Sequence, residues 1–425
     1  MRERRPSALA AATTAGALLA VLAACSGGTN AGSDAGGGTK TLTLASFDQG
    51  SLEDVVKAFE KDNPGVKVRY TLSGADQYQQ QIRTKLASGT APDVMSVWPG
   101  NGNPGATHVL AEPGYLMDLS DRPWAAKYPP ALKSLAQYEG KTYNAIFGQN
   151  GIGAVYNQDA LDRSGLTAPG TWSELLAFCK DAAAKGTPAF ALGNQDNWVT
   201  QIALYALVAT TVYGPDRDFD QKMQAGQATF SDSAWTTAMA KYQQMEETGC
   251  FQKNPLGTSY EASQDLAAGG KTLGIIQGNW VIALLKGKNP AGRFTLGVLP
   301  ATDDPASFLM PAAAGGGYGV NAKTKNKELA LKFVDFVMSP KGMNLFVTKQ
   351  GSLPALPDTG FTVDPSLTEL STFIGDDRTV PFMDQLWPNP KVQQTMLSGL
   401  QEIFSGQSTA DQVLAAMDKD YRAGS

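Results

Sequence analysis

Three strand-like stretches near the start of the chain decide the fold: Thr41-Leu-Thr-Leu-Ala45, Val66-Lys-Val-Arg-Tyr-Thr-Leu72 and Asp93-Val-Met-Ser-Val-Trp98. Each is rich in β-branched and apolar residues, and the second alternates apolar and polar positions, as strands do. Two helix-like segments separate the three stretches. Strands that alternate with helices indicate a parallel sheet covered by helices. The sequence therefore predicts an α/β fold.

The two intervening helices are predicted from residue spacing. The first has Ser51 as its expected N-cap and ends at Asn63-Pro64-Gly65. The second is expected over residues 76–88. The apolar face of the first helix repeats at helical spacing: Leu52, Val55, Val56 and Phe59.

Several polar and aromatic residues follow the predicted strands directly. Asp48 and Gln49 come after the first strand, and Trp98 and Asn101 come at and after the third. Ligands of such sheets bind in the crevice beyond the carboxyl ends of the strands. These four residues are therefore predicted to meet a ligand.

The rest of the chain continues the alternation of helices and strands. Residues 41–425 are too many for one hydrophobic core, so we expect two domains. The later predicted elements are a helix opened by the capping box Thr171-Trp172-Ser173-Glu174, a helix over 234–248, strands over 271–276 and 294–299, a helix over 325–338, and helices from about residue 390 with a break near Ser405-Gly406.

The N-terminus has the pattern of a secretory signal over residues 1–24. Arg2, Arg4 and Arg5 precede an apolar stretch that ends in small residues just before Cys25. This ending resembles a bacterial lipobox. The resemblance implies cleavage before Cys25 and attachment of acyl chains such as palmitate to that cysteine. The alternative is a transmembrane anchor, for which the apolar stretch is short.

Residues 25–40 form the expected tether. After Cys25 they consist of Gly, Ser, Thr, Asn, Asp and Ala, with no large apolar side chain, and they end in Lys40. Such a segment buries too little surface to offset the entropy of ordering. We expect it to hold the folded part away from a membrane.

Composition excludes several classes of function. The 35 basic and 40 acidic residues give a net charge of −5, without a basic run suited to nucleic acid. His108 is the single histidine, which disfavours most metal sites and histidine-based catalysis.

In an oxidising compartment Cys179 and Cys250 are expected to form a disulfide, and two separate buried thiols are the alternative.

The order and spacing of short motifs resemble one family along nearly all of the chain after the tether. That family is the extracellular solute-binding proteins of ABC importers, in the sugar-binding group related to maltose-binding protein. The motifs are Lys85-Leu-Ala-Ser-Gly89, Pro92-Asp93-Val94, Gly114-Tyr-Leu-Met-Asp-Leu119, Tyr156-Asn157, Gly278-Asn-Trp280, Gly297-Val-Leu-Pro300, Gly316-Gly317, Asn326-Lys-Glu-Leu-Ala330, Phe333, Ser339-Pro340 and Gly351-Ser-Leu-Pro354.

The resemblance implies a type II periplasmic-binding-protein fold with two α/β lobes, a hinge and a cleft between them. Lobe I is expected over residues 41–148 and 302–348, and lobe II over 149–301 and 349–425. The resemblance further implies a monomer without cofactor, metal or enzymatic activity. It would be lipid-anchored on the extracellular face of the cell membrane and would deliver a mono- or oligosaccharide to the transmembrane subunits of a permease.

Aromatic platforms beside polar groups suit the C–H faces and hydroxyl groups of sugars. Trp280 and Trp198 are the first candidates, because the resemblance implies a stacking Trp at both places. Trp98, Tyr318 and Trp387 are further aromatic candidates. The polar candidates are Gln49, Asp48, Asn101, Gln149 and Glu261.

Two other classes of function stay open at this point. A secreted lipoprotein glycoside hydrolase needs two carboxylates at a fixed separation, and no pair is distinguished by its local context. A binding protein for a non-sugar solute is the second alternative. A calcium loop is not expected at 216–227, because Gln221 and Gln227 replace the required Gly and Glu.

Overall fold

The structure is a computed structural model that describes residues 39–47, 51–356, 358 and 360–424. The signal segment, Cys25 and nearly all of the tether lie outside the described residues. The three predicted strands and two predicted helices open the fold, in the expected order. They are β1 (Lys40–Ser46), α1 (Leu52–Asp62), β2 (Val66–Leu72), α2 (Ala75–Ala87) and β3 (Val94–Val97).

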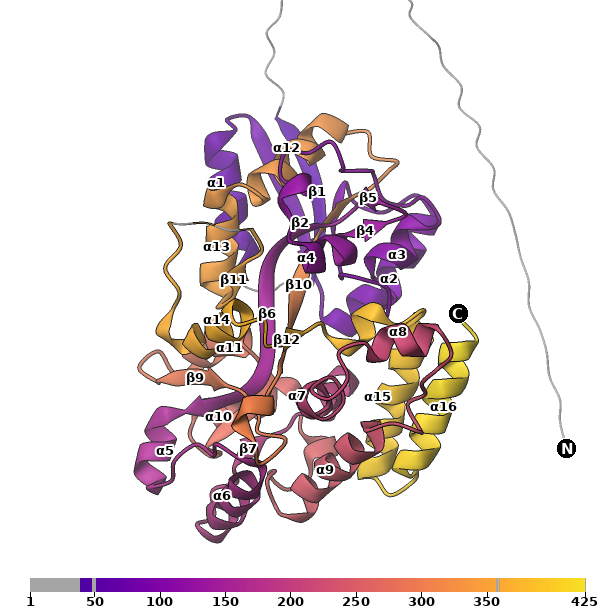
Figure 1. The fold of residues 1–425 in the computed structure, drawn as a ribbon. Coiled ribbons are helices and arrows are strands. Elements are labelled where there is room, and N and C mark those ends of the chain that lie inside the picture. Colours follow the sequence, from indigo (N-terminus) through magenta and orange to yellow (C-terminus); the bar gives the residue numbers. More distant parts are fainter. Residues whose placement is uncertain (1–38, 48–50, 357, 359, 425) are drawn as a thin grey trace, which may run out of the picture. The chain divides into compact units, whose positions relative to one another are not determined.

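Two long strands, β6 and β10, divide the remaining elements into three groups along the chain (Figure 1). Before β6 come α3 (Thr107–Ala111), η1 (Ala125–Lys127), α4 (Pro130–Ala136), β4 (Gln137–Tyr138) and β5 (Lys141–Thr142). From β6 to β10 the elements are β6 (Ala145–Asn157), α5 (Gln158–Ser164), α6 (Trp172–Ala184), β7 (Phe190–Ala191), η2 (Asn197–Val199), α7 (Thr200–Thr211), α8 (Phe219–Gln224), α9 (Trp235–Glu247), η3 (Pro255–Gly257), α10 (Tyr260–Ala268), β8 (Gly274–Gly278), α11 (Val281–Lys288), β9 (Phe294–Gly297), η4 (Pro305–Ser307) and β10 (Met310–Val320).

The chain ends in a mainly helical segment. Its last two helices, α15 and α16, pack side by side, as Figure 1 shows. The elements after β10 are α12 (Lys327–Val337), α13 (Pro340–Gln350), β11 (Leu353–Pro354), η5 (Pro365–Leu367), α14 (Thr368–Gly375), β12 (Thr379–Val380), η6 (Met383–Leu386), α15 (Pro390–Phe404) and α16 (Ala410–Arg422).

The main sheet has the strand order β2-β1-β3-β10-β6-β8-β7. β1 pairs in parallel with β2 and β3, as the strand–helix alternation predicts. β10 then runs antiparallel to both β3 and β6, and β6 runs antiparallel to β8. The pairing of β6 with β10 shifts register between Ala314 and Gly317, where β10 consists of three glycines. One sheet therefore continues through the whole described fold.

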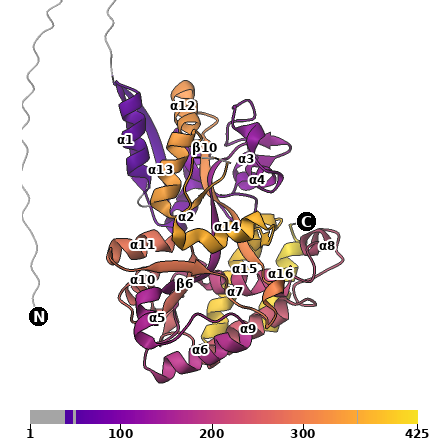
Figure 2. The same cartoon turned by 60° about the vertical axis from the view of Figure 1, so that its left-hand side comes forward.

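Two groups of buried side chains show the two lobes. In the first lobe, Leu42 of β1 and Phe59 of α1 belong to a core that also includes Phe333 of α12 and Phe346 of α13. The rings of Phe59 and Phe333 meet edge to face at 5.1 Å. Figure 2 shows α1, α12 and α13 gathered on one side of this lobe. A chain segment after β10 thus completes the first lobe.

The second lobe has its own core, built from α6, α7, α9, α15 and α16. α7 is buried around nearly its whole circumference, because other helices and the sheet surround it. The two-lobe α/β fold class predicted from the sequence is confirmed. The lobe boundaries stay a prediction, and Ala355 and Leu356 pack with the first-lobe core although residues 349–425 are expected in lobe II.

Local differences from the predicted elements have identifiable causes. Ser51 stands at the N-cap of α1, but its backbone is helical and its side chain makes no capping bond. Thr171 caps α6 by accepting a bond from the Glu174 N–H, whereas the Glu174 carboxylate accepts from the N–H of Gly170 at 2.8 Å. The predicted capping box is therefore only half formed.

The strand predicted over 271–276 begins later, at Gly274. Gly270 follows α10 with a φ of +65°, and the Lys271 N–H donates to the carbonyl of Leu266 in the same turn. The chain is still completing the end of α10 where the sequence pattern suggests a strand. β8 therefore covers Gly274–Gly278.

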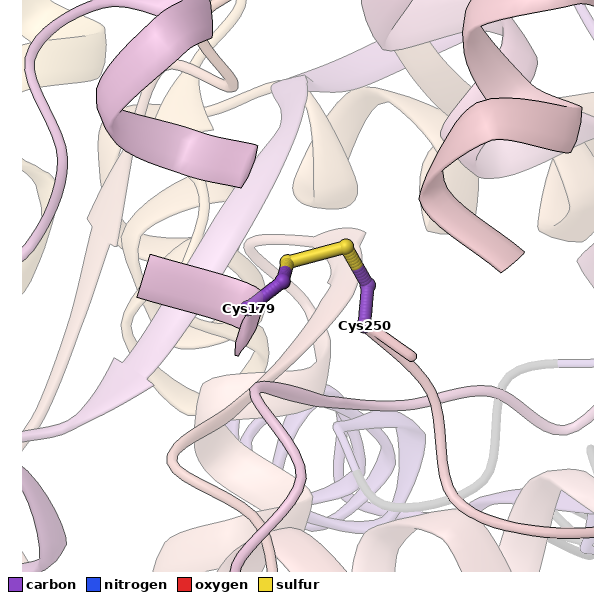
Figure 3. The surroundings of a disulfide bond; sticks show 2 residues. All are labelled: Cys179 and Cys250. Carbon is purple, nitrogen blue, oxygen red and sulfur yellow. A yellow bond between two sulfur atoms is a disulfide. The ribbon is translucent and has the colours of Figure 1, made fainter. Parts of the chain in front are cut away.

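A disulfide joins Cys179 of α6 to Cys250, which follows α9 (Figure 3). The two Cα atoms lie 4.6 Å apart, and both side chains are fully buried in the second-lobe core. The bond links positions 71 residues apart. A cross-link of this span restricts the unfolded chain and is worth about 4 kcal/mol in the chain-entropy model.

We predict that the double variant Cys179→Ala/Cys250→Ala unfolds at a lower urea concentration than the wild type. The expected loss is about 4 kcal/mol in the free energy of unfolding, because the unfolded chain regains freedom. Equilibrium urea unfolding without reductant measures it. Wild-type protein unfolded in the presence of reductant is the control and should resemble the variant. An unchanged unfolding midpoint in the variant would contradict the prediction.

Candidate functional site

A cavity of about 930 Å³ is lined by residues of both lobes. The first lobe contributes residues that follow β1 and β3 and the first turn of α2. The second lobe contributes residues from η2, α7, α10 and α11, and from the segment that contains η6. The cavity therefore includes the carboxyl ends of parallel strands, which is where the sequence predicts a ligand site.

Two aromatic rings of the first lobe, Phe47 and Trp98, line the cavity, and Tyr78 packs against both of them. Phe47, just after β1, stacks on Trp98, just after β3, with ring centroids 4.0 Å apart and planes inclined by 18°. Tyr78 of α2 meets both rings at 5.6–6.0 Å. The Tyr78 hydroxyl donates to the carbonyl of Ser96 at 2.7 Å, which fixes the cluster to β3. The predicted candidate Trp98 thus lines the cavity with a partner on one of its faces.

Glycines of β10 allow the backbone to approach this wall. A Cβ on Gly316 would lie 3.4 Å from the Phe47 ring, so this ring rests almost on the strand. The neighbouring Tyr318 also lines the cavity, as predicted from its Gly-rich context. Its side chain is 1% exposed, and its hydroxyl lies 3.3 Å from that of Ser46. Tyr318 therefore supports the cavity floor more than it projects into it.

The second-lobe wall contains the two leading candidates, Trp198 and Trp280. Trp198 meets Tyr260 edge to face at 4.8 Å, and Trp280 meets Phe382 at 6.4 Å. All four rings line the cavity and are partly exposed. A Cβ at Gly278 would fall 2.0 Å from the ring of Trp280. The Gly-x-Trp motif is thus explained, since only glycine leaves room for the ring to fold back over β8.

Four carboxylates line the same cavity. Asp76 belongs to the first turn of α2, Asp196 precedes Trp198, Glu261 belongs to the first turn of α10, and Asp384 lies in η6. Asp196 accepts a bond from the Tyr260 N–H at 2.6 Å. Partial burial, and then the negative charge of Asp196, raise the pKa of Asp76. Burial raises the pKa of Asp384 to about 6.

Amide side chains and two lysines complete the lining. The Gln393 amide donates to the Gln201 amide oxygen at 3.1 Å. Gln385 donates through Nε2 to the carbonyl of Ala314 at 2.9 Å. Lys288 and Lys349 lie at the same cavity. Hydrogen-bond donors and acceptors thus surround the aromatic rings, an arrangement that can hold a small, polar, ring-containing ligand.

Five predicted site residues line the cavity, namely Trp280, Trp198, Trp98, Tyr318 and Glu261. Three others lie elsewhere in the structure, namely Asn101, Trp387 and Gln149. The last two, Asp48 and Gln49, lie outside the described residues.

Asn101 contacts the opposite lobe. Its N–H donates to the carbonyl of Gln385 at 3.1 Å, and its side-chain amide donates to the carbonyl of Pro388. The backbone is so close here that a Cβ on Gly102 would lie 1.8 Å from the carbonyl oxygen of Asp384. The structure therefore corrects the prediction for Asn101, because its amide is occupied by a lobe-to-lobe contact.

Trp387 and Gln149 also differ from the prediction. The Trp387 ring is 1% exposed and packs between Phe230 and Trp235, at 5.6 and 6.0 Å, in the second-lobe core. Gln149 donates to the carbonyl of Pro354 at 3.1 Å, which ties β6 to β11. Neither residue belongs to the cavity lining.

Several lining residues escaped the sequence prediction. Phe47 directly follows a predicted strand, and Asp196 is two residues before Trp198, so both could have been predicted from their position in the sequence. Asp76, Tyr260 and Gln385 carried none, because only the packing of helices against the sheet turns them toward the cavity.

No cluster of three or more His, Cys, Asp or Glu side chains suited to a metal ion occurs in the described part of the chain. Among the same residues, no helix combines the length and the apolar character needed to cross a membrane.

Two lobes that share one sheet and enclose a lined cavity define the class of two-lobe, type II solute-binding proteins. The family described as bacterial extracellular solute-binding protein matches residues 45–344, and this chain belongs to that family.

Curated relatives cover most of the chain. The multiple sugar-binding protein of Streptococcus mutans is 23% identical over 355 residues, which span 81% of this chain and 83% of that protein. The maltooligosaccharide ABC transporter solute-binding lipoprotein of Streptococcus pneumoniae is 26% identical and spans 76% of this chain and 73% of its own. A solved structure of the solute-binding protein RafE in complex with raffinose has the same fold, with a TM-score of 0.76, 23% identity and coverage of 90% and 100% of the two chains.

We predict that Asp384→Asn changes how stability depends on pH. A carboxyl whose pKa is raised in the folded state contributes stability that is fully present below its unfolded pKa of 3.8. This contribution is lost as the pH rises through the folded pKa of about 6. The variant should therefore lose about 2–3 kcal/mol less than the wild type between about pH 4 and pH 6. Urea unfolding across this pH range measures the difference. Identical pH profiles for both proteins would contradict the assignment.

Proposed function

We propose that this chain is the extracytoplasmic capture subunit of an ABC importer and binds a mono- or oligosaccharide in the cavity between its lobes. The observation that carries the proposal is the pair of aromatic walls, Phe47 and Trp98 on one lobe and Trp198, Tyr260 and Trp280 on the other. Sugar rings present apolar C–H faces that pack on such rings. Their hydroxyl groups match the carboxylates and amides at the same cavity.

The mode of action that we propose is reversible binding without a chemical step. The lobes would close on the saccharide by a hinge motion along the strands that join them. Closure would then be recognised by the permease, and a separate subunit would supply energy from ATP. The names of the two streptococcal relatives agree with a saccharide ligand.

We further propose that the protein is lipid-anchored through Cys25 and acts as a monomer outside the cytoplasm. The lipobox-like ending of the N-terminal segment supports the anchor. The relative from Streptococcus pneumoniae is named a lipoprotein. A tether of small polar residues would keep the binding lobes close to the permease and raise their effective concentration there.

Screening thermal stability against a saccharide library tests the proposed function. A saccharide that binds only the folded state should stabilise it by about 2.7 kcal/mol when present at 100 times its dissociation constant. Peptides and divalent metal ions serve as comparison ligands. Stabilisation by one of these, with none by any saccharide, would contradict the proposal. Release of reducing sugar from a bound glycoside would instead indicate a hydrolase.

We predict that Trp280→Ala weakens saccharide binding on the order of tenfold, because the ligand loses an aromatic platform. Isothermal titration calorimetry measures the affinity, and circular dichroism checks that the variant is folded. Tyr70→Ala is the matched control, since Tyr70 is 36% exposed on β2 and does not line the cavity. Wild-type affinity in the Trp280 variant would remove this ring from the site.

A further inference from the structure

The charged side chains that line the cavity differ in whether they already form ion pairs within the protein. Lys288 holds its Nζ 2.6 Å from Asp265 Oδ1, and Lys349 holds its Nζ 3.7 Å from Asp54 Oδ2. Both cations of the lining are thus neutralised by carboxylates of their own surroundings. A negatively charged ligand would have to compete with these pairs.

The carboxylates of Asp76, Asp196 and Asp384 form no such ion pair among the described residues. Within the described residues, none of the three has a Lys, Arg or His nitrogen within ion-pair distance of 4.0 Å. Asp76 belongs to the first lobe and Asp196 to the second, so they line the cavity from opposite lobes. Partial burial, and then the negative charge of Asp196, raise the pKa of Asp76. Negative charge therefore faces negative charge across the site.

The aromatic residues next to Asp196 favour a positively charged ligand. Trp198 follows Asp196 by two residues, and Tyr260 donates its N–H to the Asp196 carboxylate while its ring meets Trp198 at 4.8 Å. The faces of such rings carry partial negative charge and attract cations. A carboxylate bordered by Trp and Tyr rings is therefore suited to an ammonium group.

We propose that the saccharide bound here carries a protonated amine, which lies between Asp76 and Asp196 while its ring packs on Trp198 and Trp280. This inference rests on the proposed function, because it names the class of saccharide. A hydroxyl group can also donate to a carboxylate, but it leaves two negative charges facing each other. An ammonium group neutralises them and forms charge-assisted hydrogen bonds, which are about twice as strong as neutral ones.

Two disaccharides that differ only at the amine positions test the inference on the full chain. The β-1,4-linked disaccharide of glucosamine carries two amines, and cellobiose has hydroxyl groups at the same positions. At about pH 6.5 an amine with a pKa near 8 is protonated. By isothermal titration calorimetry at low salt, the diamine should bind at least about tenfold more tightly than cellobiose. Added salt should reduce this preference, because it screens the charges.

Charge-neutral variants locate the effect. Asp76→Asn and Asp196→Asn keep the shape of the side chains and should each lower the preference for the diamine by several-fold. Asp181→Asn is the matched control, because Asp181 is exposed on α6 and does not line the cavity. It should keep the wild-type preference. Circular dichroism checks that all three variants are folded.

Equal or tighter binding of cellobiose by the wild type, or a preference that survives both cavity variants, would overturn the inference. It would also be overturned if neither disaccharide bound while another neutral saccharide did, and the proposed function would then stand. The absence of binding by every saccharide would overturn the proposed function as well.

Discussion

The pairing of β6 with β10 holds the two lobes together. The two strands run antiparallel through the middle of the sheet, where β10 also pairs with β3 of the first lobe and β6 with β8 of the second. Each lobe has its own buried core, and these strands join the two cores through backbone hydrogen bonds. The cavity lies beside this junction, so its two walls are held by one continuous sheet. The glycines of β10 at the register shift let the aromatic ring of Phe47 approach the backbone.

The residues at the ends of strands, at the start of a helix and in a loop around this junction determine the chemistry of the cavity. Strand ends supply Phe47 and Trp98, while a helix start and a loop supply Asp76 and Asp196. The rings offer flat apolar surface, and the carboxylates and amides offer direction. The contact of Asn101 with Gln385 and Pro388 connects the first lobe to the segment that contains Asp384. The groups that line the site are thus attached to the backbone that links the lobes.

Much of the fold could be predicted from the sequence, because local patterns agree with it. The alternation of Val66–Leu72 and the helical spacing from Leu52 to Phe59 each define an element without help from the rest of the chain. The site was less predictable. Trp280 was found through its Gly-x-Trp motif, whereas Trp387 has an equally polar context but packs into a helical core. Asp76 and Gln385 could not be found, since only tertiary packing brings residues more than 300 positions apart to one cavity.

We propose that a saccharide binds between the two lobes against their aromatic walls. A crystal structure of the protein with a saccharide that stabilises it tests this claim most directly. We expect electron density for the sugar in the cavity of about 930 Å³, with a C–H face within about 4 Å of Trp280 or Trp198 and hydroxyl or amine groups on Asp196. A saccharide bound elsewhere on the protein, with none in this cavity, would contradict this mode of binding.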